Sequence, residues 1–204
     1  MGRDHGADRL PSCRAVAMTA MSINASLHRS LLSPYRIACA SALRGRILDV
    51  GGGLGDYLPY FNGEVVLADV SHQALCEAPI AARVQASGER LPFRDSCFDA
   101  AWACAVAQYL DLTRFVAELM RVTRHGGRIM LLVPNGRSPW DPIKRWLGYE
   151  TWAEQAGTVR QYTVDDLAVL GQVTGEIRFL PGEGLLRTWP RLGHTLMLDI
   201  TVAK

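Results

Sequence analysis

The chain has 204 residues, a formal net charge of +2, and 49% hydrophobic and 21% charged residues. This length suits one α/β domain with a sizeable core, and these proportions are typical of globular proteins. The near-neutral charge excludes an extended nucleic-acid-binding face, and no apolar run reaches the length of a membrane span. We therefore expect no nucleic-acid partner and no membrane insertion.

The first segment is polar and is interrupted by glycine and proline, so residues 1–20 are expected to be disordered. Residues 21–204 are expected to form a single domain. Within it, a helix is predicted from about Ile23 to Leu43, with a break near Ser33-Pro34.

Cysteine and histidine usage points to a reduced protein without a metal. The cysteines form no C-x-x-C pair, and the histidines do not cluster with them at zinc spacing. A scattered, odd set of cysteines suits a cytoplasmic protein, in which each is expected to be a small buried residue. The cysteines are Cys13, Cys39, Cys76, Cys97 and Cys104.

A buried strand followed by a glycine-rich turn is the most informative element. The apolar run Ile47–Val50 contains Asp49 and is followed by Gly51, Gly52, Gly53 and Gly55. Glycine has no Cβ and tolerates positive φ, so such a turn brings bare backbone close to a ligand. A helix with free N–H groups at its N-terminus is expected next. This layout is typical of a nucleotide-type cofactor site at the carboxyl end of a parallel strand.

The spacing of the glycines narrows the choice of cofactor. A dinucleotide fingerprint needs G-x-G-x-x-G, but its third glycine would fall at Asp56, which argues against NAD-dependent oxidoreduction. A second strand, Glu64–Asp69, ends in a carboxylate where a βαβ cofactor site places its ribose-binding acid. Asp69 can accept hydrogen bonds from both ribose hydroxyls. The alternative is that Asp69 caps the next helix, near Ser71.

The remaining elements continue to alternate, which predicts a parallel sheet with helices on both faces. They are a strand from Phe98 to about Cys104, a helix from Leu112 that ends at residues 124–127, a strand over 128–134, a helix capped by Thr163, and strands over 176–180 and 195–202.

Four ordered motifs, within residues 46–134, resemble the class I S-adenosylmethionine (SAM) dependent methyltransferases. They are the D-x-G-x-G-x-G pattern from Asp49, the acidic strand end at Asp69, the segment Leu91–Asp99 (LPFRDSCFD), and Glu118-x-x-Arg121-Val122 with the Gly126-Gly127 turn. The resemblance implies a Rossmann-like fold, with a mostly parallel seven-stranded sheet of order 3-2-1-4-5-7-6 whose last strand is antiparallel. It also implies SAM as the cofactor.

The resemblance also implies a set of cofactor contacts. Ser87 and Gly88 replace the family's Asp-Ala pair at the adenine, and Glu89 either substitutes for the lost charge or is solvated. Cys104 lies either at the cofactor mouth or in the core, and Arg36 either meets the SAM carboxylate or is an exposed helix arginine. The implied cofactor-binding residues are Asp49, Gly51, Gly52, Gly53, Gly55, Asp69, Val70, Ser87, Gly88, Glu89, Ala103, Cys104 and Arg36.

Residues 135–162 are rich in tryptophan and tyrosine and follow the fifth strand, at the edge where such sheets bind ligands. They form either a lid insertion over a small organic substrate or a packing segment that covers the sheet edge. No catalytic residue is assigned. Candidates for an acceptor-side group, each with a structural role as the alternative, are His72, Tyr109, Tyr149, Tyr162 and His194.

The resemblance implies transfer of a methyl group from SAM to a small-molecule acceptor through O, N or C, with release of S-adenosylhomocysteine. One alternative is an enzyme of this fold that uses SAM for a reaction other than methylation. The other is a catalytically inactive, methyltransferase-like binding protein. The acceptor and the oligomeric state are left open.

Overall fold

The computed structural model describes residues 34–148, 160–177, 184–186 and 189–203. Its strands are β1 (Arg44–Val50), β2 (Asn62–Asp69), β3 (Arg83–Gln85), β4 (Phe98–Cys104), β5 (Thr123–Pro134), β6 (Gln172–Ile177), β7 (Gly184–Leu186) and β8 (Thr195–Thr201). They form one sheet in the order β3-β2-β1-β4-β5-β8-β6-β7. The predicted order is confirmed, with β8 as the inserted strand, and the short β7 extends the edge.

The direction of the strands gathers several loop segments at one edge of the sheet. β1 to β5 run parallel to one another, whereas β8 is antiparallel to both β5 and β6. The carboxyl ends of β1, β2, β4 and β5 therefore meet at the same edge, where open α/β sheets bind ligands.

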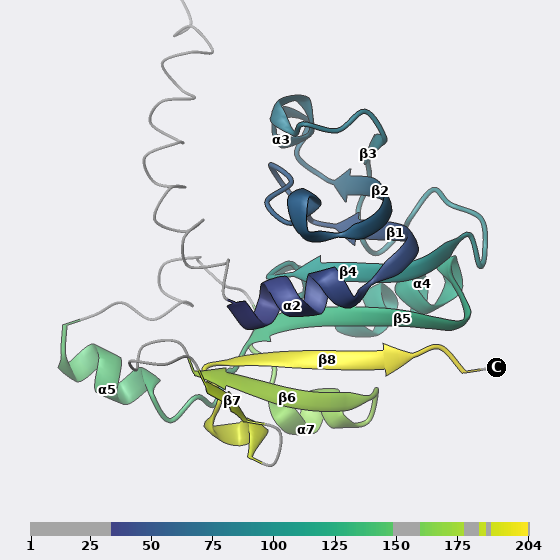
Figure 1. The fold of residues 1–204 in the computed structure, drawn as a ribbon. Coiled ribbons are helices and arrows are strands. Elements are labelled where there is room, and N and C mark those ends of the chain that lie inside the picture. The colour runs from purple at the N-terminus through teal and green to yellow at the C-terminus, as the bar shows by residue number, and fades with distance from the viewer. Residues whose placement is uncertain (1–33, 149–159, 178–183, 187–188, 204) are drawn as a thin grey trace, which may run out of the picture. The chain divides into compact units, whose positions relative to one another are not determined.

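Helices cover both faces, as predicted. They are α2 (Pro34–Ala42), α3 (His72–Glu77), α4 (Leu112–Val122), α5 (Asp141–Trp146) and α7 (Val164–Ala168). Figure 1 shows α2 in front of the sheet and α4 and α7 behind it. Phe115 of α4 and Leu167 of α7 belong to the core cluster that contains Leu48 and Ile129 of the sheet. None of the described helices is both long enough and apolar enough to cross a membrane.

The predicted helix after the glycine turn is wrong. β1 ends at Val50 and β2 begins at Asn62, and the connection contains only a 3-10 helix, Leu58–Tyr60. The connection is short, and Pro59 within it has no N–H group to donate to a helical carbonyl. The backbone that follows the glycines is therefore a loop rather than the N-terminal turn of an α-helix.

Other boundaries shift by a few residues. α2 begins at Pro34, in agreement with the predicted break, and residues 23–33 of the predicted helix lie outside the described residues. α4 ends at Val122, and β5 follows at once. The pairing of β5 with β4 shifts register between Thr123 and Arg128, the stretch that contains Gly126-Gly127. β6 begins four residues before the predicted start, at Gln172. The predicted cap is confirmed, because Thr163 and Asp166 form a reciprocal capping box on α7.

Arg121 ties two of the sequence motifs together. Its guanidinium donates to the backbone oxygens of Leu91, at 3.0 Å, and Phe93, at 2.8 Å. It also donates to Glu118 at 2.7 Å, and Glu118 in turn accepts the N–H of Leu91 at 2.8 Å. The E-x-x-R pair on α4 therefore fixes the loop that leads into β4.

We expect Arg121→Met to lower the free energy of unfolding by about 2–3 kcal/mol, because several acceptors lose a charged donor. Arg121→Lys should recover only part of this loss, since an ammonium group cannot span the same acceptors. Urea unfolding measures both effects. Arg114→Met, on the exposed side of the same helix, is the control and should change stability little. Equal stabilities for the two methionine variants would contradict the role of Arg121.

Candidate functional site

The glycine turn after β1 presents backbone to open space. Gly53 has a φ of +54°, and a Cβ built there would meet no atom within 4 Å. Its N–H donates to Oδ2 of Asp69 over 2.9 Å, while the N–H of Gly51 donates to the oxygen of Ala68 over 2.7 Å. The turn is thus anchored to β2 and leaves one side free for a ligand to approach the backbone.

Asp49 is a buried carboxylate that lacks a partner. It is 1% exposed, and its Oδ2 atom has no hydrogen-bond partner among the described residues. Burial, together with the nearby negative charges of Asp69 and Asp56, raises the pKa of Asp49 from 3.8 to about 8. An unsatisfied buried carboxylate is costly, so this position favours a ligand that brings a cationic donor such as an ammonium group.

Asp69 lies at the end of β2 with its carboxylate held in place. Oδ1 accepts the N–H of Ser71 at 2.8 Å, and Oδ2 accepts the N–H of Gly53. Ser71, whose hydroxyl accepts the N–H of Ala74, is the N-cap of α3. The capping interpretation of Asp69 is therefore wrong. Its half-buried carboxylate keeps further lone pairs for a diol, and the neighbouring Val70 is an apolar side chain that is 63% exposed.

Ser87, Gly88 and Glu89 form a tight loop against the start of α4. The Ser87 hydroxyl accepts the N–H of Glu89 at 3.2 Å, and Oε1 of Glu89 accepts the N–H of Asp111 at 2.6 Å. A Cβ at Gly88 would lie 2.7 Å from the ring of Phe115. The interpretation of Glu89 as a solvated side chain is therefore wrong, since it tethers this loop to the N-cap of α4. The adenine contact remains a prediction.

Arg36 lies on the buried side of α2, so its interpretation as an exposed helix arginine is wrong. It is 3% exposed, and its Nη2 atom donates to Oγ1 of Thr195 at 2.9 Å. It also interacts with Tyr57 and lowers the pKa of that hydroxyl, but burial and Cys104 raise this pKa more strongly. The arginine therefore lies on the same side of the sheet as a buried tyrosine of the loop after β1.

Cys104 is half-buried at the end of β4, and the Tyr57 hydroxyl lies 3.4 Å from its sulfur. The core interpretation of Cys104 is therefore wrong, and the expectation of buried cysteines fails also for exposed Cys76 and half-buried Cys97. Ala103, the preceding residue, has a fully buried side chain, so only its backbone remains for a ligand. The sequence analysis missed Tyr57, although its place directly after the glycine turn was a usable signal.

The acceptor-side candidates are scattered. Tyr109 follows β4 and is 50% exposed, whereas the Tyr162 hydroxyl donates to the oxygen of Leu110 at 3.1 Å. His72 is exposed on α3, and Tyr149 lies outside the described residues. His194 is buried, and its Nε2 atom contacts Lys144 and lies 3.8 Å from Asp141. Tyr162 and His194 therefore contact different parts of the molecule.

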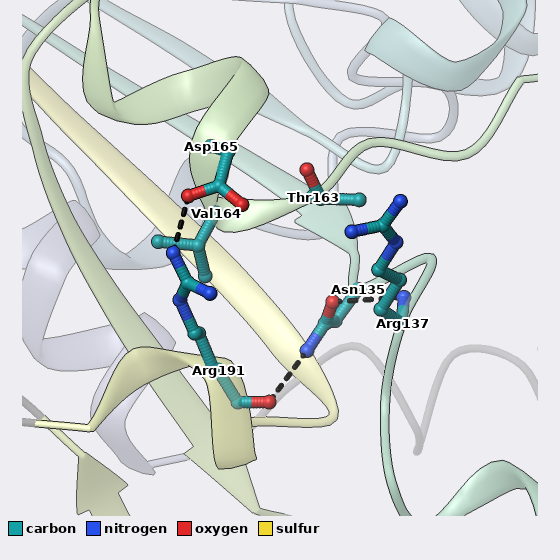
Figure 2. Close-up of a pocket in the computed structure, with 6 residues that line it drawn as sticks. All are labelled: Asn135, Arg137, Thr163, Val164, Asp165 and Arg191. Atoms are coloured by element: carbon teal, nitrogen blue, oxygen red, sulfur yellow. Dashed lines mark hydrogen bonds and ion pairs between the residues drawn. The ribbon is translucent and has the colours of Figure 1, made fainter.

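A cavity opens beside the end of β5, with an empty volume of about 390 Å³ that is partly open to solvent. Figure 2 shows polar side chains from the loop after β5, the start of α7 and the 3-10 helix Pro190–Leu192 directed toward it. The sequence analysis named none of these side chains as a site. The lining residues are Asn135, Arg137, Thr163, Val164, Asp165 and Arg191.

Comparison with known proteins shows that the chain is similar to methyltransferases. Residues 48–131 match the family model described as a methyltransferase domain. The chain is 34% identical over 124 residues to the ubiquinone/menaquinone biosynthesis C-methyltransferase of Idiomarina loihiensis, covering 52% of this chain and 49% of that protein. The protein of the same name from Vibrio parahaemolyticus is 33% identical over 128 residues, with 54% and 49% covered. The chain spans about half the length of these two curated relatives.

A solved structure supports the fold over nearly the whole chain. It is a SAM-dependent methyltransferase, described as a possible histamine N-methyltransferase, from Thermotoga maritima. The TM-score is 0.69 at 18% identity, and the match covers 92% of this chain and 96% of that one. At this identity the likeness concerns the fold alone.

Proposed function

We propose that the chain is a class I SAM-dependent methyltransferase, which transfers the methyl group of SAM to a small-molecule acceptor and releases S-adenosylhomocysteine. The orphaned carboxylate of Asp49, buried beside an open glycine turn, is the observation that carries the proposal. SAM offers both an ammonium group for such a carboxylate and a ribose diol for a second one, as Asp69 provides.

The residues at the sheet edge divide between the two ends of the cofactor. Asp49 would accept the ammonium group, and the turn over residues 51–55 would lie against the methionine part. Arg36, buried near the same loop, would meet the carboxylate. Asp69 would bind the ribose hydroxyls, because its carboxylate is already oriented by two backbone N–H groups.

The adenine end would lie between two loops. Val70 supplies an exposed apolar side chain next to Asp69, suited to one face of a ring. The loop of Ser87, Gly88 and Glu89 follows β3, and a Ser87 hydroxyl or a backbone group there would read the ring edge. The backbone of Ala103 and the side chain of Cys104 would line the mouth at the end of β4.

SAM supplies an electrophilic methyl group. The protein's main task is therefore to bind SAM, to orient the acceptor toward the methyl group and to exclude water. Positioning two reactants alone contributes up to about 7–11 kcal/mol to such reactions. We assign no general base, because Tyr162 and His194 are engaged in contacts of their own. The lid assignment for residues 135–162 and the domain limits of 21–204 are part of this proposal.

A screen of candidate small molecules would identify the methyl acceptor. The relatives are named for ubiquinone and menaquinone biosynthesis, so quinone-type acceptors enter the screen first. We propose a reducing, cytoplasmic setting, which the free cysteines of the described residues support. Product mass decides between the reaction classes, since methyl transfer adds one CH₂ group and yields S-adenosylhomocysteine. An altered product without added mass would indicate another SAM-dependent reaction.

We expect Asp69→Ala to weaken SAM binding by about a hundredfold, because two charge-assisted hydrogen bonds to the ribose are lost. Asp69→Asn should lie between this variant and the unmodified protein, since an amide oxygen still accepts one bond. Calorimetric titration with SAM and with S-adenosylhomocysteine measures both. Glu64→Gln removes an exposed carboxylate from the same strand and serves as the control. Unchanged affinity in Asp69→Ala would show that the cofactor assignment is wrong.

A further inference from the structure

The cavity beside β5 has a rigid frame built around one buried side chain. Asn135 is buried, and its amide Nδ2 donates to the oxygens of Arg191, at 3.2 Å, and Gly193, at 2.7 Å. Its Oδ1 accepts the N–H of Arg137 at 3.1 Å. Asn135 therefore fixes the positions of two arginine-bearing segments on either side of the cavity (Figure 2).

The guanidinium groups of Arg137 and Arg191 differ in their interactions with the protein. Arg191 forms an ion pair with Asp165, whereas the guanidinium of Arg137 has no hydrogen bond to any described residue. Asp166, which does not line the cavity, interacts electrostatically with Arg137, while its Oδ2 atom accepts the N–H and the hydroxyl of Thr163. The cavity thus presents an arginine whose donors are available, next to a second arginine with donors to spare.

We propose that this cavity binds an anionic group, a carboxylate or a phosphate, carried by the methyl acceptor. A planar guanidinium matches both anions through paired N–H donors, and two such groups across a small cavity provide this recognition. The proposal rests on the proposed function, and it narrows the substrate class to acceptors with one anionic end.

The cavity is linked to the cofactor edge by a short chain of contacts. The N–H of Gly136, in the loop that lines the cavity, donates to the oxygen of Tyr162 at 2.8 Å. The Tyr162 hydroxyl reaches the oxygen of Leu110, and the next residue, Asp111, donates its N–H to Glu89. An acceptor anchored by its anionic end would therefore extend along the edge on which β4 and β5 both end.

Titration of the full chain with inorganic phosphate, and separately with acetate, tests the cavity directly. Two-dimensional ¹H–¹⁵N spectra would follow the Nε–H groups of the arginines. We expect phosphate to shift the Arg137 signal and Arg137→Gln to raise the phosphate dissociation constant about fivefold. Asp165→Asn should lower that constant about threefold, because it releases Arg191 from its ion pair. The relative strength of phosphate and acetate distinguishes a phosphoester from a carboxylate acceptor.

Arg94→Gln provides the matched control, since Arg94 is an exposed arginine on the loop before β4 and makes none of these contacts. Equal phosphate constants for Arg137→Gln, Arg94→Gln and the unmodified protein would overturn the proposal. Titration with S-adenosylhomocysteine, in phosphate-free buffer, is run on the same variants and should be unchanged in all of them. Failure of the unmodified protein to bind S-adenosylhomocysteine would instead contradict the proposed function. With an acceptor in hand, Arg137→Gln should raise KM and leave kcat unchanged; an unchanged KM would overturn the link to the acceptor.

Discussion

Replacing Asp49 with asparagine is expected to stabilise the folded protein at neutral pH while removing most of its affinity for SAM. The pKa of Asp49 is raised from 3.8 to about 8, first by burial and then by Asp69 and Asp56. Between these two values the folded state keeps a proton that the unfolded state has lost. The stability that Asp49 contributes is therefore fully present below about pH 4 and is lost as the pH rises toward about 8. Since one pKa unit corresponds to about 1.4 kcal/mol, a rise from 3.8 to about 8 makes the total loss on the order of 6 kcal/mol.

Urea unfolding at several pH values between these limits measures this effect. In Asp49→Asn the pH dependence should be much weaker, and the free energy of unfolding near pH 8 should be higher than in the unmodified protein. Glu64→Gln is the control for the loss of a carboxylate at an exposed position. If Asp49→Asn unfolds with the same pH dependence as the control, the proton does not reside on Asp49.

The same group couples cofactor binding to proton release. A bound ammonium group favours the ionised form of Asp49, so SAM binding should expel a proton at neutral pH. Calorimetric titrations in buffers with different ionisation enthalpies count this proton. Asp49→Asn should release none, and its affinity for SAM should fall by about a hundredfold, since a neutral amide replaces the carboxylate opposite the ammonium group.

Alanine at two adjacent glycines should separate stability from ligand binding. A Cβ at Gly52 would lie 2.2 Å from Cδ1 of Leu67 and 2.5 Å from Oδ2 of Asp49, both in the packed interior. Gly52→Ala is therefore expected to cost about 2–3 kcal/mol of stability. At Gly53 the same methyl group enters open space, so Gly53→Ala should cost only about 1 kcal/mol, from its positive φ.

For SAM affinity we expect Gly53→Ala to show a large loss relative to its small loss of stability. The methyl group of Gly53→Ala occupies the space in which the backbone would approach SAM, and we expect an affinity loss of about a hundredfold with the fold intact. Thermal unfolding and calorimetric titration of both variants make the comparison. A stable Gly53→Ala variant with full SAM affinity would place the cofactor away from this turn.

The strands and their acidic ends could be located from local sequence, whereas the strand order was implied by the family resemblance. The runs that became β1, β2 and β4 are short and apolar, and each has a polar or glycine-rich end, so periodicity alone locates them. Asp49 and Asp69 could be predicted as a pair because parallel strands bring their carboxyl ends to one edge. The helix expected after the glycines did not form, because the connection is short and Pro59 has no N–H group to donate, so local sequence overrode the strand–turn–helix layout.

The sequence by itself thus determined the strands, the glycine turn and the two carboxylates. Only the tertiary structure decided the environment of these groups: the Oδ2 atom of Asp49 is buried without a hydrogen-bond partner among the described residues, and Arg36 is buried against Thr195. It also decided the cavity, since Arg137 and Arg191 are separated by more than fifty residues and meet only through Asn135. The physical reason is that periodicity encodes which face a residue takes, whereas burial and partners depend on segments remote in the chain.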